Sequence, residues 1–309
     1  MKGLSQFIQE RTDQAKIGCK TLLITLFGDV ISQHGSSVWL GSLIETLQPF
    51  GYSERLVRTS VFRLVKDDWL KVRKIGRKSY YSLTDNAKKH YTKAACRIYS
   101  ETRQHDDDRW LIVMPSFVAD SQLTQLKKQL KWLGFSSLST NLYAHPYANK
   151  SSLDSTLREL ELTDSVIIFS AKTIDENSLA CLKKLIFEKW NLIELERQYD
   201  EFIEIYQSIY DSLHDKAEGI NNQNSFLLRL LVIHEYRRTL LKDSDLSKSM
   251  LSDHWSGYIA HQLTKKLYAF LSKSSQQYIT STLKSEVGFL PKADAEYYNR
   301  FGEDHLINK

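Results

Sequence analysis

Apolar residues recur every three or four positions in the first part of the chain, and this period predicts amphipathic helices. The first helix is expected over residues 20–33 and the second over residues 40–48, with a short extended piece at residues 38–39 between them. Residues 49–52 form a turn by their types. A third helix is predicted over residues 53–68, because Ser53 is a good N-cap.

The third predicted helix has two distinct faces. Its apolar stripe consists of Leu56, Val57, Val61, Leu64 and Val65. A polar and largely basic set falls away from that stripe and is expected to face solvent: Glu54, Arg55, Arg58, Thr59 and Arg63. Four aromatic residues of the region are expected in the core: Phe27, Trp39, Phe62 and Trp69.

A β-hairpin is predicted next. Residues 69–74 and 78–83 partly alternate between apolar and polar types, and they flank a turn that contains Gly76. The hairpin is densely basic, with Lys71, Arg73, Lys74, Arg77 and Lys78. Thr84 then caps another helix, which is expected to run to about residue 101.

This order of elements is that of a winged helix-turn-helix. The third helix would enter the major groove, where arginine bonds guanine edges, and the hairpin would neutralise phosphates. The residues expected to bind DNA are Ser53, Glu54, Arg55, Arg58, Thr59, Arg63, Arg73, Lys74, Arg77 and Lys78. On an isolated helix the same arginines would indicate only a solvated face. It is the preceding helix-turn and the following basic hairpin that favour DNA contact. Arg63 lies further along the helix, where a phosphate or an acidic neighbour is the alternative partner.

The remainder of the chain divides into two patterns. Strands at residues 110–115, 137–143 and 165–170 (the last expected to be buried) alternate with helices at 121–133 and 152–160, which indicates a small α/β or ferredoxin-like unit. Helices then dominate, over residues 179–190, 192–214, 223–242, 255–271 and 274–283. The tail from residue 290 to residue 309 is expected to be irregular. The predicted fold class is α+β and mostly α.

Charge is unevenly distributed along the 309 residues. Residues 1–100 contain 17 lysine and arginine residues against 8 aspartate and glutamate residues, whereas the other 209 contain 25 against 29. A basic head on a slightly acidic body is typical of nucleic-acid-binding regulators, although basic patches also bind acidic proteins and membranes. No apolar run is long enough to span a bilayer, and the N-terminus lacks the apolar segment of a secretory signal, so we expect a cytoplasmic protein. Three dispersed cysteines fit a reducing compartment.

An acidic stretch, residues 105–108 (His-Asp-Asp-Asp), is interpreted as a solvated linker and not as a metal cluster, because consecutive carboxylates point in different directions. It separates the expected domains: a DNA-binding head over 1–105, a ferredoxin-like middle domain over 106–175 and a helical domain for effector binding and dimerisation over 176–309. We predict no metal site and no cofactor. Motifs of hydrolases, nucleotide-binding loops and Cys-x-x-Cys pairs are absent from the sequence.

The sharpest polar cluster in the C-terminal part spans residues 234–238 (His-Glu-Tyr-Arg-Arg). Adjacent arginines are able to hold the phosphates of a coenzyme A ester, or to form interdomain or interchain salt bridges with an acidic helix. The candidate effector-binding residues are His234, Tyr236, Arg237, Arg238 and Trp255. Asp253 and His254, beside Trp255, suggest a polar pocket or a helix cap.

Several segments resemble the PaaX family of transcriptional repressors of phenylacetic acid degradation, which have a GntR-like winged-helix head. In the head they are T-L-F-G-D (25–29), V-W-L-G-S-L-I (38–44), P-F-G (49–51), S-E-R-L-V-R-T-S-V-F-R-L-V-K-D-D-W-L (53–70) and G-R-K-S-Y-Y-S-L-T (76–84). Further on they are K-W-L-G-F (131–135), H-E-Y-R-R-T-L-L-K-D (234–243), W-S-G (255–257) and L-Y-A-F-L (267–271). The resemblance covers most of the chain.

The resemblance implies a homodimeric repressor that leaves a palindromic operator when phenylacetyl-CoA binds, with residues 53–68 as recognition helix, 71–81 as wing and a Cas2-like middle domain. Ser244 and Leu251-Ser252 stand where the family usually has proline after the aspartate and a Leu-Pro pair, so the inducer is expected to be phenylacetyl-CoA or a different aryl-acyl-CoA. A Cas2-like metal-dependent nuclease is the enzymatic alternative, but the first strand of the middle domain ends in Met114-Pro115-Ser116, without a carboxylate. A DNA-bound scaffold without an effector is the third possibility.

Overall fold

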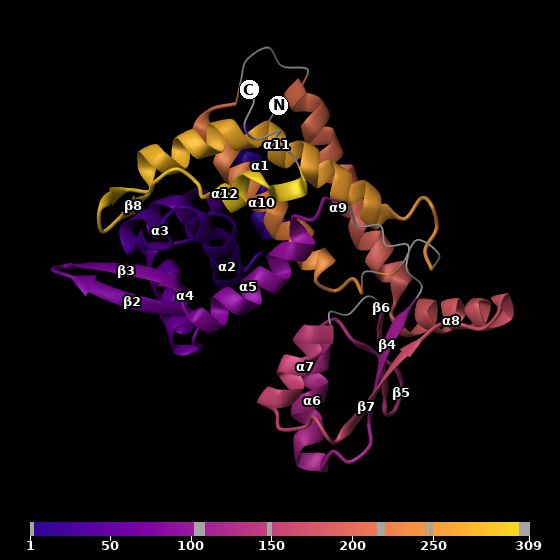
Figure 1. Ribbon diagram of the computed structural model, residues 1–309. Coiled ribbons are helices and arrows are strands. Elements are labelled where there is room, and N and C mark those ends of the chain that lie inside the picture. Colours follow the sequence, from indigo (N-terminus) through magenta and orange to yellow (C-terminus); the bar gives the residue numbers. More distant parts are fainter. Residues whose placement is uncertain are drawn as a thin grey trace. The chain divides into compact units, whose positions relative to one another are not determined.

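The computed structural model describes residues 3–101, 109–146, 150–214, 220–244, 246 and 250–302 (Figure 1). The chain forms two compact units. Unit 1 contains residues Met1–Thr102, Phe202–Arg238 and Ala260–Lys309, and unit 2 contains Arg103–Glu201 and Thr239–Ile259. Residues of the expected head and of the expected C-terminal domain therefore share unit 1. No helix in the described part of the chain is long and apolar enough to cross a membrane.

Unit 1 begins with helices and a three-stranded sheet in the order β1-β3-β2. Its first elements are α1 (Leu4–Gln14), α2 (Cys19–Asp29), η1 (Ile31–Gln33), β1 (Val38–Trp39), α3 (Leu40–Leu47), η2 (Gln48–Phe50), α4 (Glu54–Lys66), β2 (Leu70–Ile75), β3 (Lys78–Leu83) and α5 (Asp85–Ile98). From α2 onward this is the predicted winged helix-turn-helix order. Helix α1 was not expected from the sequence.

Local chemistry explains where these elements begin and turn. Gly51 takes a φ of 87° after η2, a left-handed conformation that suits glycine. The Ser53 hydroxyl accepts a hydrogen bond from the Leu56 amide and caps α4. The Thr84 hydroxyl accepts one from the Ala87 amide and caps α5. Gly76 opens the two-residue turn between β2 and β3 at a φ of 57°, which again favours glycine.

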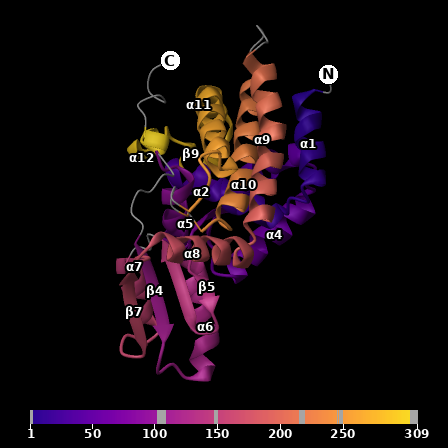
Figure 2. The same cartoon turned by 90° about the vertical axis from the view of Figure 1, so that its right-hand side faces the viewer.

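Helix α10 (Asn222–Leu240) is the central element of unit 1. Every residue from Ser225 to Tyr236 on it is buried, as expected of a helix that is surrounded on all sides. Helices α1, α9 (Leu192–His214) and α11 (Ser256–Thr282) lie around it (Figure 2). The C-terminal part of unit 1 continues with β8 (Lys284–Ser285), β9 (Gly288–Phe289), α12 (Ala295–Tyr298) and η3 (Arg300–Gly302).

Unit 2 has the β-α-β-β-α-β order of a ferredoxin-like fold. Its elements are β4 (Trp110–Pro115), α6 (Asp120–Trp132), β5 (Ser136–Ser139), β6 (Leu142–Pro146), α7 (Lys150–Glu159), β7 (Val166–Ala171) and α8 (Glu176–Lys189). The strands pair antiparallel in the order β5-β6-β4-β7. The α+β, mostly α fold class predicted from the sequence is confirmed.

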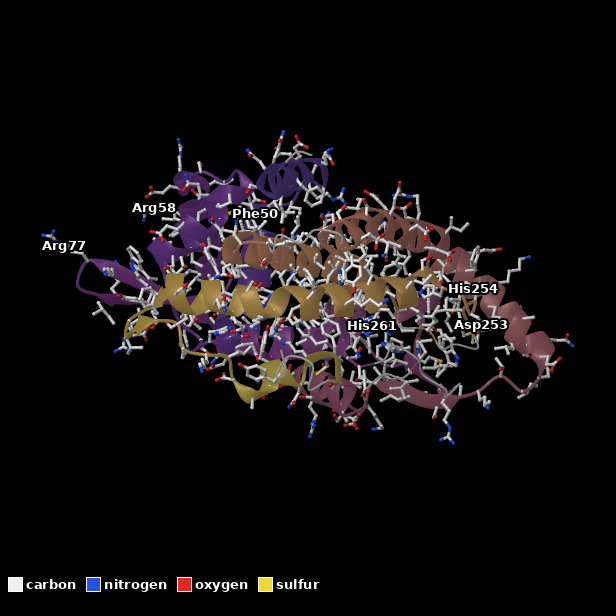
Figure 3. All side chains as sticks on the ribbon, turned by 90° about the horizontal axis from the view of Figure 1, so that it is seen from above. Phe50, Arg58, Arg77, Asp253, His254 and His261 are labelled. Carbon is white, nitrogen blue, oxygen red and sulfur yellow. The ribbon has the colours of Figure 1, made fainter. Side chains whose placement is uncertain are left out.

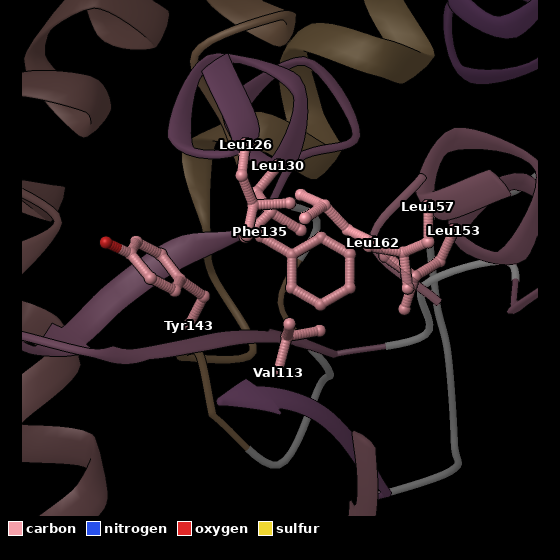
Figure 4. Close-up of a cluster of buried hydrophobic side chains, with 8 residues drawn as sticks. All are labelled: Val113, Leu126, Leu130, Phe135, Tyr143, Leu153, Leu157 and Leu162. Carbon is pink, nitrogen blue, oxygen red and sulfur yellow. The ribbon is translucent and has the colours of Figure 1, made fainter. Parts of the chain in front are cut away.

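The core of unit 2 lies between one face of this sheet and the two helices α6 and α7. Phe135 is surrounded there by leucines of both helices and by Val113 of β4 (Figure 4). The eight residues of the cluster are Val113, Leu126, Leu130, Phe135, Tyr143, Leu153, Leu157 and Leu162. One face of the sheet supplies this core, to which Val113 of β4 and Tyr143 of β6 belong.

Four sequence predictions about elements were wrong. Residues 137–143 are not one strand, since they belong to β5, a turn and β6. The strand expected to be buried at 165–170 is the edge strand β7, and Ile167 and Phe169 on it are 40% and 45% exposed. The two helices expected at 255–271 and 274–283 are the single helix α11. The tail expected to be irregular contains α12 and η3, with Tyr297 and Arg300 buried.

Candidate DNA-binding surface

Helix α4 turns one face into unit 1 and the opposite face to solvent. Val57, Ser60, Val61 and Leu64 are buried, and the helix contacts α2, α3 and β2. The exposed side chains are Glu54, Arg55, Leu56, Arg58, Thr59, Phe62, Arg63 and Lys66. Every residue of α4 that the sequence analysis expected to bind DNA is therefore accessible.

Three local contacts in α4 and at its N-cap involve five of the expected DNA-binding residues. The Ser53 hydroxyl accepts the Leu56 amide at 3.3 Å. The Arg58 guanidinium contacts the Glu54 carboxylate, with Nη2 to Oε1 at 2.6 Å and Nε to Oε1 at 2.8 Å. The Thr59 hydroxyl donates to the Arg55 carbonyl. Both side chains of the Glu54–Arg58 pair are more than half exposed, so water screens their attraction. The ion pair is therefore weak, and another partner is able to replace Glu54.

The wing carries the second group of expected residues. Arg73, Lys74, Arg77 and Lys78 are all exposed, and Arg77 projects from the hairpin, as Figure 3 shows together with Arg58. Arg73 Nη1 lies 3.9 Å from Glu286 Oε1, and Lys78 Nζ lies 5.0 Å from the centre of the Trp39 ring. Because β2 follows α4 directly and packs against it, the cations of the helix and of the wing belong to one unit.

The expected packing of the large apolar residues was partly wrong. Phe27 is fully buried, as predicted. Phe62, in contrast, is 68% exposed, and Leu56 is 43% exposed. Trp39 and Trp69 are half-buried, and the Trp69 ring stacks on His90 with centroids 6.3 Å apart. Phe62 lies on the side of the helix opposite Val57, Val61 and Leu64, the apolar side chains that pack into unit 1.

Four of the five candidate effector-binding residues contact protein groups within unit 1. His234 Nδ1 lies 2.8 Å from Thr25 Oγ1, which also accepts a hydrogen bond from Arg237 Nη1 at 2.8 Å. Arg238 donates to the Ala15 carbonyl, and the Tyr236 hydroxyl lies 3.0 Å from His261 Nδ1. Burial, together with the nearby Arg237 and Arg238, lowers the pKa of His234 to about 3. The contacts of His234, Arg237 and Arg238 join α10 to the head of the same unit, and that of Tyr236 joins it to α11.

Trp255, the fifth candidate, lies in unit 2. It is buried, and its ring makes an edge contact with Tyr199, with centroids 6.2 Å apart. The Tyr199 hydroxyl donates to Asp243 at 2.8 Å, and the Ser256 hydroxyl donates to Asp200. His254 beside it is exposed.

A buried ionic cluster in unit 1 was not found by sequence reasoning. Asp29 of α2 accepts hydrogen bonds from Tyr99 at 2.6 Å, from Tyr268 at 3.1 Å and from Arg300 at 2.8 Å, and Arg229 lies 3.3 Å from its second oxygen. Burial opposes ionisation of Asp29, but the two guanidinium groups and the two hydroxyls outweigh it and lower the pKa of this carboxyl. Arg229 within an otherwise apolar run of α10 was the one sequence signal that pointed to such a partner.

In the described part of the chain, no three His, Cys, Asp or Glu side chains group as metal ligands would. The acidic stretch at residues 105–108 lies outside the described residues. Strand β4 ends at Pro115, and Ser116 and Phe117 follow it.

Comparisons with known proteins indicate the same family along most of the chain. Three family models match: the PaaX-like protein over residues 19–87, the PaaX protein central Cas2-like domain over 103–181 and the PaaX-like protein C-terminal domain over 190–281. The transcriptional repressor PaaX of Escherichia coli (strain K12) is 34% identical over 302 residues, which cover 98% of this chain and 96% of the relative. The solved structure of the uncharacterized protein Rv0674 from Mycobacterium tuberculosis has a TM-score of 0.44 at 18% identity, over 76% of this chain and 88% of that one. That score is too low to support a conclusion. With a full-length relative at 34% identity and three matching family models, this chain belongs to the PaaX family.

Proposed function

We propose that this protein is a cytoplasmic transcriptional repressor that binds operator DNA through α4 and the β2–β3 wing. The observation that carries the proposal is the exposed face of α4, with Arg55, Arg58, Arg63 and Lys66, in the same unit as the exposed cations of the wing. A helix of this width fits the major groove, and arginine binds guanine O6 and N7 bidentately. The similarity to a transcriptional repressor over nearly the whole chain supports the same function.

Base and backbone contacts are divided between the two elements in this proposal. Arg55 and Arg58 lie in the first turns of α4, the part of a recognition helix that contacts base edges. Lys74, Arg77 and Lys78 of the wing contact phosphates, which position the protein without adding sequence information. A homodimer places two such heads on the halves of a palindromic operator, about one helical turn apart.

We further propose that the repressor controls phenylacetic acid catabolism and that phenylacetyl-CoA releases it from DNA; a different aryl-acyl-CoA is the alternative inducer. An effector releases the protein only if its affinity differs between the conformation that binds DNA and the conformation that does not. The candidate effector-binding residues in this proposal stay His234, Tyr236, Arg237, Arg238 and Trp255, with the contacts of the first four to neighbouring elements of unit 1 as the structural alternative.

The test is fluorescence anisotropy of the purified protein on DNA from upstream of the neighbouring catabolic operon, at fixed salt. We expect tight binding that phenylacetyl-CoA releases and that free phenylacetate and coenzyme A do not. Benzoyl-CoA serves as the matched aryl-acyl control. Binding that no thioester changes would contradict the inducer, and an equal affinity for random DNA would contradict operator recognition.

A further inference from the structure

Phe62 is the large apolar side chain that α4 exposes most, at 68% of its surface. A single exposed apolar residue is common on protein surfaces and needs no explanation by itself. The position of Phe62 is what distinguishes it. It lies on the face opposite Val57, Val61 and Leu64, the three apolar side chains by which α4 packs into unit 1.

The neighbours of Phe62 form one line along the exposed face. Arg55, Thr59, Phe62 and Lys66 follow each other at spacings of four, three and four residues, which on a helix places them in a single row. Two members of this row are cationic and one carries a hydroxyl. The side chain at position 62 leans toward the preceding turn, where Arg58 and Thr59 lie, because helical Cα–Cβ bonds tilt toward the N-terminus.

The charges around Phe62 indicate what covers this face. A hydrophobic protein surface would leave Arg55 and Lys66 without partners. A membrane surface would attract both cations, but it binds a helix in proportion to the apolar area that the helix buries, and this row offers only the Phe62 side chain. DNA supplies both kinds of partner, because phosphates neutralise the cations and the floor of the major groove carries one apolar group, the thymine 5-methyl. Phenylalanine is among the side chains that contact this methyl.

We infer that Phe62 determines part of the operator sequence by packing against a thymine methyl group in each half-site. This inference rests on the proposed DNA-binding function and extends it to one further residue and one base. A methyl group removed from water contributes about 0.8 kcal/mol, which corresponds to about a fourfold change in affinity. The contact adds no charge, so it leaves the salt dependence of binding unchanged.

The test uses the full-length protein and a 30-base-pair duplex that it enriches from a random library. Each thymine is replaced in turn by deoxyuridine, which lacks only the 5-methyl group and keeps the base pair. We expect one or two replacements in each half-site to weaken the wild-type protein about fourfold. The affinity of Phe62→Ala for the parent duplex should be at least about fourfold lower than that of the wild type. This variant should no longer distinguish thymine from uracil at those positions.

Controls separate this contact from a general loss of binding. Phe117→Ala removes a phenylalanine that is 82% exposed in unit 2 and should behave as wild type. Phe62→Leu keeps an apolar side chain and should retain part of the discrimination. The slope of log affinity against log salt should be the same for Phe62→Ala and wild type, because no phosphate contact is lost. Circular dichroism confirms that the variants are folded.

The outcomes distinguish the inference from the function on which it rests. If the wild type enriches a specific duplex but Phe62→Ala binds it equally well, or remains equally sensitive to deoxyuridine, then Phe62 does not contact a thymine methyl and the repressor function stands. If no sequence is enriched over random DNA, the proposed operator recognition fails, and the inference about Phe62 fails with it.

Discussion

At the scale of single residues, Arg58 has a competing partner inside its own helix. Its guanidinium contacts the Glu54 carboxylate one turn earlier, and both side chains are more than half exposed. An exposed pair at this spacing contributes about 0.3–0.5 kcal/mol, whereas an arginine bidentate to guanine contributes about 1–3 kcal/mol of discrimination. If Arg58 binds a guanine as proposed, that contact would outweigh the exposed pair with Glu54.

We expect Arg58→Ala to lose on the order of 1–3 kcal/mol of binding to the enriched duplex, with a smaller loss on random DNA. The difference arises because a base contact contributes to one sequence only, whereas a phosphate contact contributes to every sequence. Anisotropy titrations on both duplexes at one salt concentration measure it. Arg158→Ala, at an exposed position on α7 in unit 2, is the matched control. A wild-type affinity for the enriched duplex would remove Arg58 from the base-contacting set.

At the scale of elements, α10 depends on the head of unit 1 for its polar partners. Arg229, His234 and Glu235 interrupt its apolar sequence, and each is buried. Their partners include Asp29, Thr25 and Arg11, which come from α2 and α1. Because buried charges are strongly destabilising without partners, these contacts fix the position of α10 among the first helices of the chain.

Asp29→Asn tests how much the buried ionic cluster around Asp29 contributes to the unfolding free energy. We expect a loss of about 3–5 kcal/mol of unfolding free energy, since the substitution leaves Arg229 and Arg300 buried without a carboxylate. Urea unfolding followed by circular dichroism measures the change. Asp67→Asn is the control, because it breaks an ion pair with Lys20 in which both side chains are over 40% exposed and should change stability by about 0–1 kcal/mol. Equal effects of the two substitutions would show that the buried cluster contributes no more than a surface pair.

Sequence periodicity located the elements whose signals are local. Ser53, Gly76 and Thr84 act within a few residues, and each marks a boundary that the structure confirms. The break expected within α11 is absent. Ser272 and Ser275 are buried, with their hydroxyls donating to the carbonyls four residues earlier, and the packing of α11 overrides the weak helix preference of small polar residues.

The features that periodicity missed depend on partners far away in the sequence. Arg300 is buried only because Asp29 and Tyr268 receive it, and nothing in residues 290–302 encodes those partners locally. The exposure of Phe62, in contrast, follows from local spacing, because Val57, Val61 and Leu64 put the buried face on the opposite side of α4. The prediction that Phe62 is buried followed its residue type and not its position. The expected DNA-binding residues were accessible because their polarity and their position after a cap are both local properties.

At the scale of the whole molecule, unit 1 is assembled from three stretches separated by as many as a hundred residues. The buried side chains that join these stretches include His34 and His234. His34 donates from Nδ1 to the Pro291 carbonyl at 2.7 Å, and His234 contacts Thr25. Burial lowers the pKa of His34 to about 4, and burial together with Arg237 and Arg238 lowers that of His234 to about 3. Both side chains are therefore neutral in the folded protein at pH 7.

The sign of the resulting pH dependence follows from proton uptake. In the unfolded chain both histidines have a pKa near 6.5, so between that value and about 4 the unfolded state binds more protons than the folded state. Stability is therefore present above pH 6.5 and is lost as the pH falls. Each histidine contributes on the order of 2 kcal/mol of loss between pH 7 and pH 5, which is a large part of the 5–15 kcal/mol typical of folded domains.

We expect the urea midpoint of the protein to fall steeply between pH 7 and pH 5, and His234→Gln to fall less steeply, because glutamine binds no proton in this range. The informative quantity is the slope with pH and not the stability at pH 7, since glutamine also changes the contact with Thr25. His254→Gln, at an exposed position, should keep the wild-type slope.

If His234→Gln and wild type lost stability in parallel, the acid sensitivity of unit 1 would have to come from its carboxylates. Asp29, whose pKa is lowered in the folded state, would produce such a loss only below about pH 4, where unfolded carboxylates take up protons. The pH at which stability is lost therefore distinguishes the two histidine contacts from the Asp29 cluster.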